Sequence, residues 1–392
     1  MHIAYVIAPG GGPEAYIRSL LPYLEPRGHR VSVVYTVGAV GLAHSFPAGV
    51  RVTHATAFPW HYVVSKLTGD FRAWPRRLRG REIGGAVHAA LDRIHSKDPI
   101  DLIEVTEGIP VAALVRRWPV VLRAHGSDWT FRHFCQDDDR RWDALLIREA
   151  ADQLQEATAV SAISRHLANH LGELCAFPPE RIGVISYPID TNIFKPTGVK
   201  DQPVTSAPSL LSIGRLEHRK GTDVLIKAMT HIWQSHPEIR VTLLGKEAQY
   251  NHSDLLGWLP KHHRDKVNFP GFVPHQALPG YYQKASIYVA PTQYETFGYT
   301  LLEAMSCGKP VISCRAGAIP ELIEDGENGI LVPFNDAGEL AAAVTHLLEN
   351  PALARQMGAA GRKQAQRYDL NRIGQVMEKL YLDTLDSFKG RR

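Results

Sequence analysis

Two cations and two carboxylates in the second half of the chain have the residue types and the spacing of a binding site. Arg215 and Lys220 stand between two glycines in the segment GRLEHRKG, which follows a short apolar run. Glu295 and Glu303 are eight residues apart, on either side of a loop and the expected start of a helix. Guanidinium and ammonium groups can hold a diphosphate, and carboxylates can accept hydrogen bonds from sugar hydroxyls. Together these four residues predict a site for a nucleotide sugar.

The two cations suit the chemistry of a leaving nucleoside diphosphate. Such a group gains negative charge as its bond to the sugar breaks, so fixed cations stabilise the transition state more than the ground state. Arginine offers a planar fork of donors to phosphate oxygens, and lysine supplies a mobile point charge. The alternative is a solvated basic turn in which Glu217 and His218 are equally exposed. A loop with glycine at both ends and spaced cations favours the binding site.

The two carboxylates suit the hydroxyl groups of a donor. Gly298 lies between them and permits a ligand to approach the backbone N–H groups at the start of the helix. Glu303 can accept hydrogen bonds from two ribose hydroxyls, and Glu295 can meet hydroxyls of a hexose. A carboxylate that caps a helix start is the alternative for either residue, and it explains the pair less well than it explains one of them.

A further glycine-rich segment, GGGPEA at residues 10–15, follows the first apolar run. It fits GxGxxA, a pattern typical of a dinucleotide site. A dinucleotide fold also places an acid at the end of its second strand, whereas residues 35–38 here read YTVG. The segment therefore indicates either a tight turn that requires glycine, or a backbone that approaches the donor or acceptor at a helix start through Gly11 and Gly12.

Length and composition describe a globular protein of two domains. A chain of 392 residues is long for one hydrophobic core. Its net charge of +4 is too small to argue for nucleic-acid binding, and its four cysteines form no CxxC pair, which favours reduced thiols. The N-terminus lacks a basic region and reaches glycine too soon for a signal peptide. No apolar run approaches the roughly 18 residues of a membrane span, so we expect a cytoplasmic protein.

Apolar runs alternate with helical patterns through both halves of the chain. Residues 2–8 and 31–35 read as buried strands with a helix between them, an order that predicts a parallel sheet covered by helices. The composition over residues 195–208 is that of a linker. We therefore expect one Rossmann-like domain over residues 1–195 and a second over residues 196–370. Ligands bind beyond the carboxyl ends of parallel strands, so two such domains can share one cleft.

Further motifs give the chain a resemblance to a known family. The segments GRLxxxKG, ExFG and E-x7-E are followed by GAIPE at 317–321 and DGENG at 325–329. With them the chain resembles retaining glycosyltransferase family 4, which has the GT-B fold. The resemblance covers most of the chain, since it extends to the N-terminal glycine loop and to the segments GHRV at 28–31, AHGSD at 124–128 and SYPID at 186–190 with Phe194.

The resemblance implies an α/β protein of the GT-B fold, with two Rossmann-like domains that face a central cleft. Residues 1–195 would bind the acceptor, residues 196–370 the nucleotide sugar, and the final helix, about 371–392, would pack back onto the first domain. His125 would contact the transferred sugar near the reacting carbon. The residues implied in catalysis are His125, Arg215, Lys220 and Glu295. Those implied in donor binding are Gly11, Gly12, Arg215, Lys220, Val273, Glu295, Thr296, Phe297, Gly298, Tyr299, Thr300 and Glu303.

Two positions depart from the pattern of the family. Tyr187-Pro188 stands where the family usually has Asn-Gly before an Ile-Asp pair, and Ala318 replaces the second glycine of GGxPE. Both departures bear on hinge or loop geometry more than on donor chemistry.

We expect no metal and no cofactor, because the nucleotide diphosphate sugar is itself a substrate. Asp137, Asp138 and Asp139 could form the divalent-metal DxD site of the other glycosyltransferase fold. Acids are also favoured at a helix start, which the local sequence predicts, and no His/Cys cluster has zinc spacing.

Residues 60–81 mix aromatic and basic side chains. Such a face can lie on an anionic membrane surface with its aromatic rings at headgroup level. It can equally be an acceptor-binding lobe with a solvated basic rim. Peripheral contact with the inner face of a membrane therefore stays open.

We expect a retaining enzyme that moves a hexose from a UDP- or GDP-linked donor to a hydroxyl of a glycan, a lipid or a small molecule. Retention follows from the resemblance alone, and the absence of a secure covalent nucleophile favours front-face attack assisted by the leaving diphosphate. The alternatives are a GT-B phosphorylase, a nucleotide-sugar epimerase, or a protein that binds sugar nucleotides without chemistry. An NAD oxidoreductase is a more distant alternative.

Overall fold

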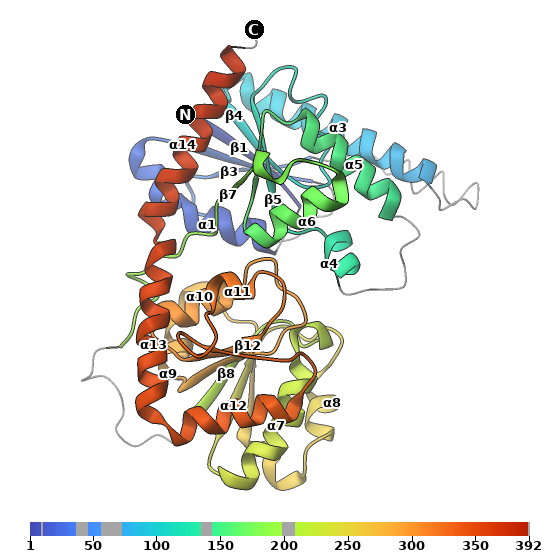
Figure 1. Cartoon of the computed structure of the whole chain (residues 1–392). Coiled ribbons are helices and arrows are strands. Elements are labelled where there is room, and N and C mark those ends of the chain that lie inside the picture. The colour runs from blue at the N-terminus through green and yellow to red at the C-terminus, as the bar shows by residue number, and fades with distance from the viewer. Residues whose placement is uncertain (9–10, 37–45, 56–72, 135–142, 198–207, 391–392) are drawn as a thin grey trace. The chain divides into compact units, whose positions relative to one another are not determined.

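The chain forms two compact units in the computed structural model (Figure 1). Unit 1 comprises Met1–Pro188 and Leu370–Arg392, and unit 2 comprises Ile189–Asp369. The structure describes residues 1–8, 11–36, 46–55, 73–134, 143–197 and 208–390. No helix among these residues combines the length and the apolar character that a membrane crossing needs.

The boundary between the units lies at Pro188, earlier in the chain than the linker composition over 195–208 indicates. The reason is the contacts that residues 189–194 make within unit 2. The backbone of Ile189 pairs with that of Asp369, and the Arg362 guanidinium donates to the carbonyl oxygens of Thr191 and Phe194, each at 2.8 Å. A segment with linker composition therefore follows a piece of chain that already belongs to unit 2.

Unit 1 is built on a parallel sheet of short apolar strands. Strand β1 is buried along its whole length, as is usual for a central strand of a sheet covered by helices. Within the described residues the sheet has seven strands in the order β3-β2-β1-β4-β5-β6-β7. Their bounds are β1 His2–Ile7, β2 Arg30–Tyr35, β3 Arg51–His54, β4 Leu102–Thr106, β5 Val120–Ala124, β6 Ala159–Ala162 and β7 Ile182–Val184.

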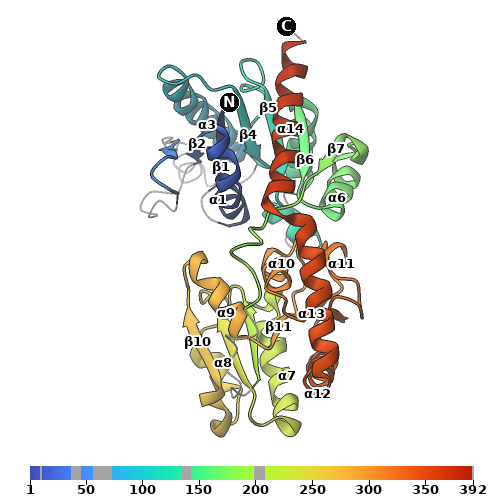
Figure 2. The same cartoon turned by 90° about the vertical axis from the view of Figure 1, so that its left-hand side faces the viewer.

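The helices of unit 1 pack against this sheet (Figure 2). The C-terminal helix α14 lies beside α1 and β5, α6 lies beside β6 and β7, and α3 lies beside β2. The last segment of the chain thus packs in the same unit as the first. The bounds are α1 Gly12–Leu24, α3 Ala73–His95, α4 Asp128–Phe134, α5 Asp143–Glu156, α6 Arg165–Cys175 and α14 Leu370–Lys389.

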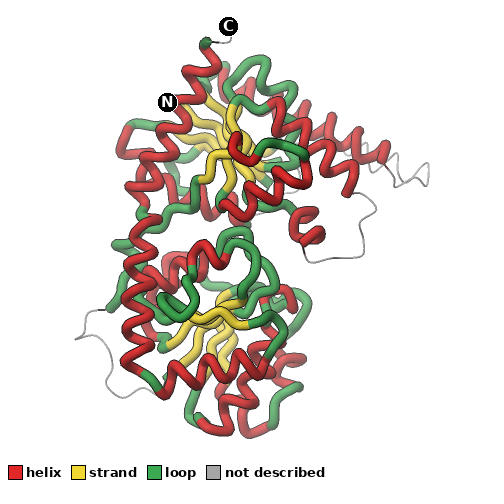
Figure 3. Tube along the Cα trace, viewed as in Figure 1, coloured by secondary structure: helices red, strands yellow, loops and turns green. Residues whose placement is uncertain are grey.

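Unit 2 repeats the same architecture around a second parallel sheet, drawn in yellow between red helices in Figure 3. Within the described residues this sheet has six strands in the order β10-β9-β8-β11-β12-β13. The strand bounds are β8 Ser209–Ile213, β9 Arg240–Leu244, β10 Val267–Gly271, β11 Ile287–Ala290, β12 Val311–Cys314 and β13 Ile330–Val332. The helix bounds are α7 Thr222–Ser235, α8 His252–Gly257, α9 Leu278–Lys284, α10 Tyr299–Ser306, α11 Ile319–Leu322, α12 Ala337–Glu349 and α13 Pro351–Ala365.

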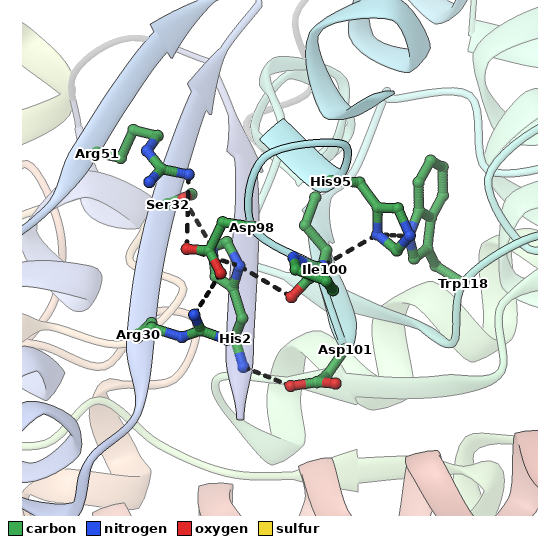
Figure 4. Close-up of polar contacts among 10 residues, drawn as sticks. His2, Arg30, Ser32, Arg51, His95, Asp98, Ile100, Asp101 and Trp118 are labelled. Atoms are coloured by element: carbon green, nitrogen blue, oxygen red, sulfur yellow. Dashed lines mark hydrogen bonds and ion pairs between the residues drawn. The ribbon is translucent and has the colours of Figure 1, made fainter. Parts of the chain in front are cut away.

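A polar cluster fixes the amino end of β1 (Figure 4). The buried ring of His2 contacts the Ser32 hydroxyl through Nε2 at 2.8 Å and the Pro99 carbonyl oxygen through Nδ1 at 3.1 Å. The His2 backbone N–H donates to the Asp101 carboxylate at 2.7 Å, and Arg30 pairs with Asp98. Burial lowers the pKa of His2, so the ring is held neutral. Because ligands of parallel sheets bind at the carboxyl ends, this cluster has a structural role.

The C-terminal helix approaches α1 closely at a glycine. A Cβ atom on Gly374 would lie only 2.3 Å from the ring of Tyr23, so glycine is the residue that permits this packing. The Tyr23 hydroxyl donates to the Glu378 carboxylate at 2.8 Å, and His29 contacts the other carboxylate oxygen at 2.7 Å. Close packing and these two polar contacts together hold α14 on unit 1.

We expect Gly374→Ala to destabilise unit 1, because the added methyl group forces the Tyr23 ring or the helix to move. Overpacking of this kind costs about 1–3 kcal/mol of the free energy of unfolding. Gly85→Ala is the matched control, since Gly85 is exposed in α3 and a Cβ there meets nothing within 4 Å. Urea titrations should show a loss for the first variant and a small gain for the second, and equal curves would contradict the packing argument.

Candidate active site

The carboxyl ends of β8 and β11 carry three of the polar residues that the sequence singled out. Arg215 and Lys220 follow β8, and Glu295 follows β11. All three line one pocket of unit 2, together with Thr292 and with Thr300 from the first turn of α10. The Lys220 ammonium group forms an ion pair with the Glu295 carboxylate. The pocket thus places two cations and one carboxylate at the sheet edge where parallel sheets bind ligands.

The glycines around the cations have an internal role. Gly221 has a φ of +68°, and a Cβ there would lie 2.0 Å from the Pro291 carbonyl oxygen. A Cβ on Gly214 would lie 3.3 Å from Cγ of Lys220, so this glycine leaves room for the aliphatic stem of the lysine. In the structure Gly221 allows its turn to approach the Pro291 segment of unit 2 closely, and Gly214 leaves room for Lys220, so the two glycines together position this lysine.

Arg215 is the more exposed of the two cations. Its side chain is 61% exposed, and its guanidinium lies 3.2 Å from the Glu217 carboxylate. The same carboxylate oxygen accepts a hydrogen bond from Arg219 at 2.7 Å. Because the Arg215 side chain is mostly exposed and Glu217 keeps Arg219 as a second partner, Arg215 can turn toward an anionic ligand at little cost.

The loop that carries Glu295 is braced from two sides. The Arg219 carbonyl oxygen accepts hydrogen bonds from the Gln293 backbone at 2.8 Å and from the Thr292 hydroxyl at 3.0 Å. The Glu295 carbonyl oxygen accepts from the Ala318 N–H at 2.9 Å, and a Cβ on Gly317, which has a φ of +57°, would lie 2.1 Å from the same oxygen. These contacts fix the loop relative to both β8 and α11.

The departure at Ala318 is compatible with this bracing. Ala318 has a φ of −83°, which any residue adopts, whereas the preceding Gly317 has a left-handed backbone. One glycine therefore suffices for the close approach to the loop.

Glu303 lies in α10 and is buried, with both carboxylate oxygens engaged. The Tyr282 hydroxyl donates to Oε2 at 2.7 Å, and His275 Nε2 lies 2.7 Å from Oε1. Burial and the nearby Glu303 charge raise the pKa of Tyr282 well above its usual value, so this phenol stays protonated as a donor. Sequence reasoning missed both partners, since neither forms a motif with Glu303.

The remaining positions implied in donor binding lie in the loop before α10, at the start of α10 and after β10, and their side chains differ in burial. Gly298 has a φ of +92° and is the residue before α10. The side chains of Thr296 and Phe297 are buried, and Phe297 packs edge-on against Tyr368. These two can therefore serve a ligand through their backbone rather than their side chains. Tyr299 and Val273 are half-buried. Tyr299 is the first residue of α10, and Val273 follows β10, which β9 separates from β8 in the sheet.

His125 follows β5 in unit 1 and is held by hydrogen bonds to its backbone and its ring, and by a further one to the backbone of its neighbour Gly126. The Glu107 carboxylate accepts from the backbone N–H groups of His125 and Gly126, each at 2.9 Å, and the Tyr187 hydroxyl lies 2.7 Å from His125 Nδ1. Burial, followed by the charge of Arg123, holds the pKa of His125 well below its usual value, so the imidazole is neutral. Sequence reasoning missed Glu107 and the role of Tyr187.

Gly11 and Gly12 stand at the start of α1 in unit 1. Gly11 has a φ of +78° and precedes the helix, and Gly12 is its first residue. Gly10, the first residue of the glycine loop, lies outside the described residues. This geometry leaves backbone N–H groups at a helix start, as the sequence indicated.

Comparison with known proteins decides the family. Residues 198–364 match the model for glycosyl transferases group 1, and residues 10–193 match that for Glycosyltransferase Family 4. The glycogen synthase of Mycobacterium tuberculosis strain H37Rv is 30% identical, over 95% of this chain and 91% of its own length. The chain is a group 1 glycosyltransferase. The resemblance inferred from the motifs is thereby confirmed.

Other similar proteins agree with this assignment. The alpha-D-kanosaminyltransferase of Streptomyces kanamyceticus is 26% identical, over 93% of this chain and 98% of its own. Sucrose-phosphate synthase from Thermosynechococcus elongatus aligns with a TM-score of 0.80 at 24% identity, over 98% of this chain and 99% of its own. Anabaena HepE in complex with UDP-glucose aligns with a TM-score of 0.73 at 22% identity, over 97% and 99%. The two structural likenesses show that the glycosyltransferase has the GT-B fold.

The acidic residues considered for a metal site, and most of the segment considered for membrane contact, lie outside the described residues of this glycosyltransferase. Asp137, Asp138 and Asp139 lie outside the described residues, as do residues 60–72 of the basic and aromatic segment. Residues 73–81 are described as part of α3 by their backbone alone. Over the part of the chain that the structure does describe, no group of three His, Cys, Asp or Glu side chains could hold a metal ion.

Proposed function

We propose that this glycosyltransferase moves a hexose from a UDP- or GDP-linked donor to a hydroxyl group of a glycan, lipid or small-molecule acceptor, with retention of the anomeric configuration and without a metal ion. The observation that carries the proposal is the ion pair of Lys220 and Glu295 beside Arg215, at the carboxyl ends of β8 and β11. The cations can bind the diphosphate of the donor, and the carboxylate beside them can accept hydrogen bonds from the hydroxyl groups of the neighbouring hexose.

The chemistry follows from these charges. As the bond from the sugar to the diphosphate breaks, negative charge grows on the leaving oxygen, and Lys220 and Arg215 stabilise it in place of a divalent cation. Glu295 would accept hydrogen bonds from hexose hydroxyls and so orient the ring. In front-face attack the leaving diphosphate takes the proton of the incoming hydroxyl, which requires no covalent nucleophile from the protein. His125 of unit 1, neutral and firmly held, would contact the transferred sugar.

A direct test combines binding with product analysis. Thermal shift measurements with UDP-, GDP- and ADP-sugars identify the donor, because a ligand that binds the folded state raises its apparent stability. UDP is the first nucleotide to try, since HepE was solved with UDP and with UDP-glucose. The donor found would then be incubated with an acceptor panel in EDTA, and NMR would report the anomeric configuration of the product.

The outcomes separate the proposal from its rivals. A product of retained configuration formed in EDTA supports the proposal. An inverted product would overturn the retaining mechanism, and full dependence on a divalent cation would overturn the metal-independent one. Turnover that requires inorganic phosphate would indicate a phosphorylase, and turnover without acceptor would indicate an epimerase. Tight donor binding without any product would indicate a sugar-nucleotide-binding protein.

We expect Glu303→Gln to weaken nucleotide binding, because ribose hydroxyls would lose a charged acceptor. Glutamine keeps the shape of the side chain beside Tyr282 and His275, whereas alanine would leave the buried Tyr282 hydroxyl without this partner. Hydrogen bonds to a charged group are worth about 1.5–3 kcal/mol, so the affinity should fall by roughly tenfold or more.

Isothermal titration calorimetry with UDP and GDP measures this loss. Glu339→Gln is the matched control, since Glu339 is an exposed carboxylate of α12 in the same unit. Equal nucleotide affinity in wild type and Glu303→Gln would remove Glu303 from the ribose site, even if transfer activity were confirmed.

A further inference from the structure

Tyr187 occupies one of the two positions at which the chain departs from the pattern of its family. Its side chain is buried in unit 1, and its hydroxyl lies 2.7 Å from Nδ1 of His125. The two rings are tilted by 32°, with centroids 5.6 Å apart, so the contact runs between polar atoms rather than between stacked faces. The departure in sequence therefore places a phenol directly on the imidazole that the proposed function brings to the sugar.

The backbone before Tyr187 is anchored on both sides. The Ile185 N–H donates to the Ala162 carbonyl oxygen at the end of β6 at 2.9 Å, and the buried Arg123 guanidinium donates to the Ile185 carbonyl oxygen at 2.7 Å. Pro188 follows, and a residue before proline is restricted to an extended backbone. These restraints leave Tyr187 little freedom to move its side chain away from His125.

The ring of Tyr187 is also fixed by stacking. It packs on Tyr16 of α1 with centroids 5.6 Å apart and an interplanar angle of 24°. Arg123 in turn lies over the Tyr16 ring, 4.4 Å from its centroid. One buried cation thus supports the chain before Tyr187 and the ring beside it, so the direction of the Tyr187 hydroxyl is set before any substrate binds.

Gly12 gives independent evidence that the hydroxyl position matters. A Cβ on Gly12 would lie 2.7 Å from the Tyr187 hydroxyl oxygen, whereas the nearest ring carbons would be at 3.7 and 3.9 Å. Gly12 is the first residue of α1, a helical position that any residue can take, in contrast to Gly11 with its φ of +78°. The glycine at position 12 is therefore explained by the space that the Tyr187 hydroxyl needs.

We infer that Tyr187 is a positioning residue that fixes the ring orientation and the tautomer of His125. A phenol is a better donor than a neutral imidazole N–H, and an imidazole nitrogen is a better acceptor than a phenol oxygen. Tyr187 therefore donates to Nδ1, and the single imidazole proton lies on Nε2. His125 then presents an N–H donor at Nε2, which is suited to an oxygen of the sugar or the leaving group. The inference rests on the role of His125 in the proposed function.

Tyr187→Phe tests the inference with a split between rate and binding. We expect kcat to fall by roughly tenfold, the worth of one net hydrogen bond that orders the ring. The nucleotide affinity should stay at its wild-type value, because the proposed nucleotide contacts, Arg215, Lys220 and Glu303, lie in unit 2, and the donor KM should change far less than kcat. Tyr23→Phe is the matched control, because it also removes one hydroxyl from a buried tyrosine of unit 1, and its kcat should equal that of wild type.

Histidine ¹⁵N NMR adds a readout that does not depend on turnover. The His125 signals are assigned by their loss in His125→Gln. We expect the wild-type shifts of a protonated Nε2 and an unprotonated Nδ1, and shifts that move toward a mixture of tautomers in Tyr187→Phe. A protonated Nδ1 in wild type, or identical shifts and kcat in the two proteins, would overturn the inference. If no transfer is found at all, the proposed function fails, and the NMR shifts still test whether Tyr187 sets the tautomer of His125.

A double-mutant cycle with Gly12 completes the test and separates it from a role of Gly12 in donor binding. Gly12→Ala should lower kcat in the wild-type background, because its methyl group displaces the Tyr187 hydroxyl, and it should add little loss in the Tyr187→Phe background. Equal losses in both backgrounds would show that the two residues act independently. A loss of donor affinity in both backgrounds would assign Gly12 to the donor instead.

Discussion

Lys220→Met should lower kcat by roughly 10²–10³-fold, the usual loss when one preorganised group that stabilises transition-state charge is removed. The Lys220 side chain is 24% exposed and pairs with Glu295, and its aliphatic stem packs closely against Gly214. Its effect should be larger in the transition state than in the ground state, because the charge on the diphosphate grows as the sugar leaves. Methionine keeps most of the apolar stem beside Gly214 and loses the charge.

Lys227→Met controls for the loss of one positive charge in the same unit. Lys227 is 60% exposed on α7 and pairs with Asp223, so its loss should leave the rate unchanged. Initial rates at saturating donor, with nucleotide affinity from calorimetry, distinguish loss of turnover from loss of binding. A Lys220→Met enzyme that turns over at the wild-type rate would remove this residue from the proposed mechanism.

Much of the fold and part of the candidate site could be predicted from sequence because their signals are local. Alternation of apolar runs and helical patterns indicates parallel sheets, whatever the packing partners are. The two cations after β8 and Glu295 after β11 could be placed together because the carboxyl ends of parallel strands meet at one sheet edge. The end of each apolar run marks the end of a strand, so the polar residues that line the pocket could be predicted to lie together.

The partners of these residues could not be predicted, because they depend on contacts distant in sequence. Tyr282 in α9 and His275 in the turn before it contact the Glu303 carboxylate. Neither residue forms a sequence motif with Glu303 that would have predicted the contact. Glu107 follows β4 and reaches the backbone of His125 after β5, which only the order of the strands explains. Side-chain partners of this kind are set by register and packing rather than by motif.

Composition was also a poor guide to the unit boundary. Residues 195–208 have the residues of a linker, yet the units divide at Pro188, because tertiary contacts of residues 189–194 with Arg362 and Asp369 decide which unit a segment joins. Residue type alone is equally uninformative at Gly221, because the close approach of the Pro291 carbonyl oxygen comes from a segment distant in sequence.

Glu104→Gln should change the pH dependence of stability, because Glu104 is a buried acid in the core of unit 1. The groups that face it come from four elements: Arg123 of β5, Tyr5 of β1, Tyr16 of α1 and Tyr381 of α14, whose hydroxyl donates to Glu104 at 2.7 Å. Burial raises the pKa of Glu104 from 4.5 to about 7, and the charge of Arg123 opposes this shift without cancelling it. The folded state therefore binds a proton that the unfolded state has already lost.

The sign of the effect follows from this difference in pKa. The stability contributed by protonated Glu104 is complete below pH 4.5, the value for the unfolded chain, and is lost as the pH rises to about 7. One pKa unit corresponds to about 1.4 kcal/mol, so the wild type should lose about 3 kcal/mol of this contribution across the interval. Glutamine is neutral throughout and can still accept from Tyr381, so the variant lacks this slope.

Urea titrations of both proteins between pH 4.5 and pH 8 measure the effect as a difference, in which other titrating groups cancel. The free energy of unfolding of Glu104→Gln, relative to wild type, should rise by about 3 kcal/mol across this range. Glu180→Gln, which removes an exposed carboxylate of the same unit, controls for the change in net charge. A difference between Glu104→Gln and wild type that stays constant with pH would show that Glu104 keeps an ordinary acidity, and that the charge of Arg123 outweighs the burial of the carboxylate.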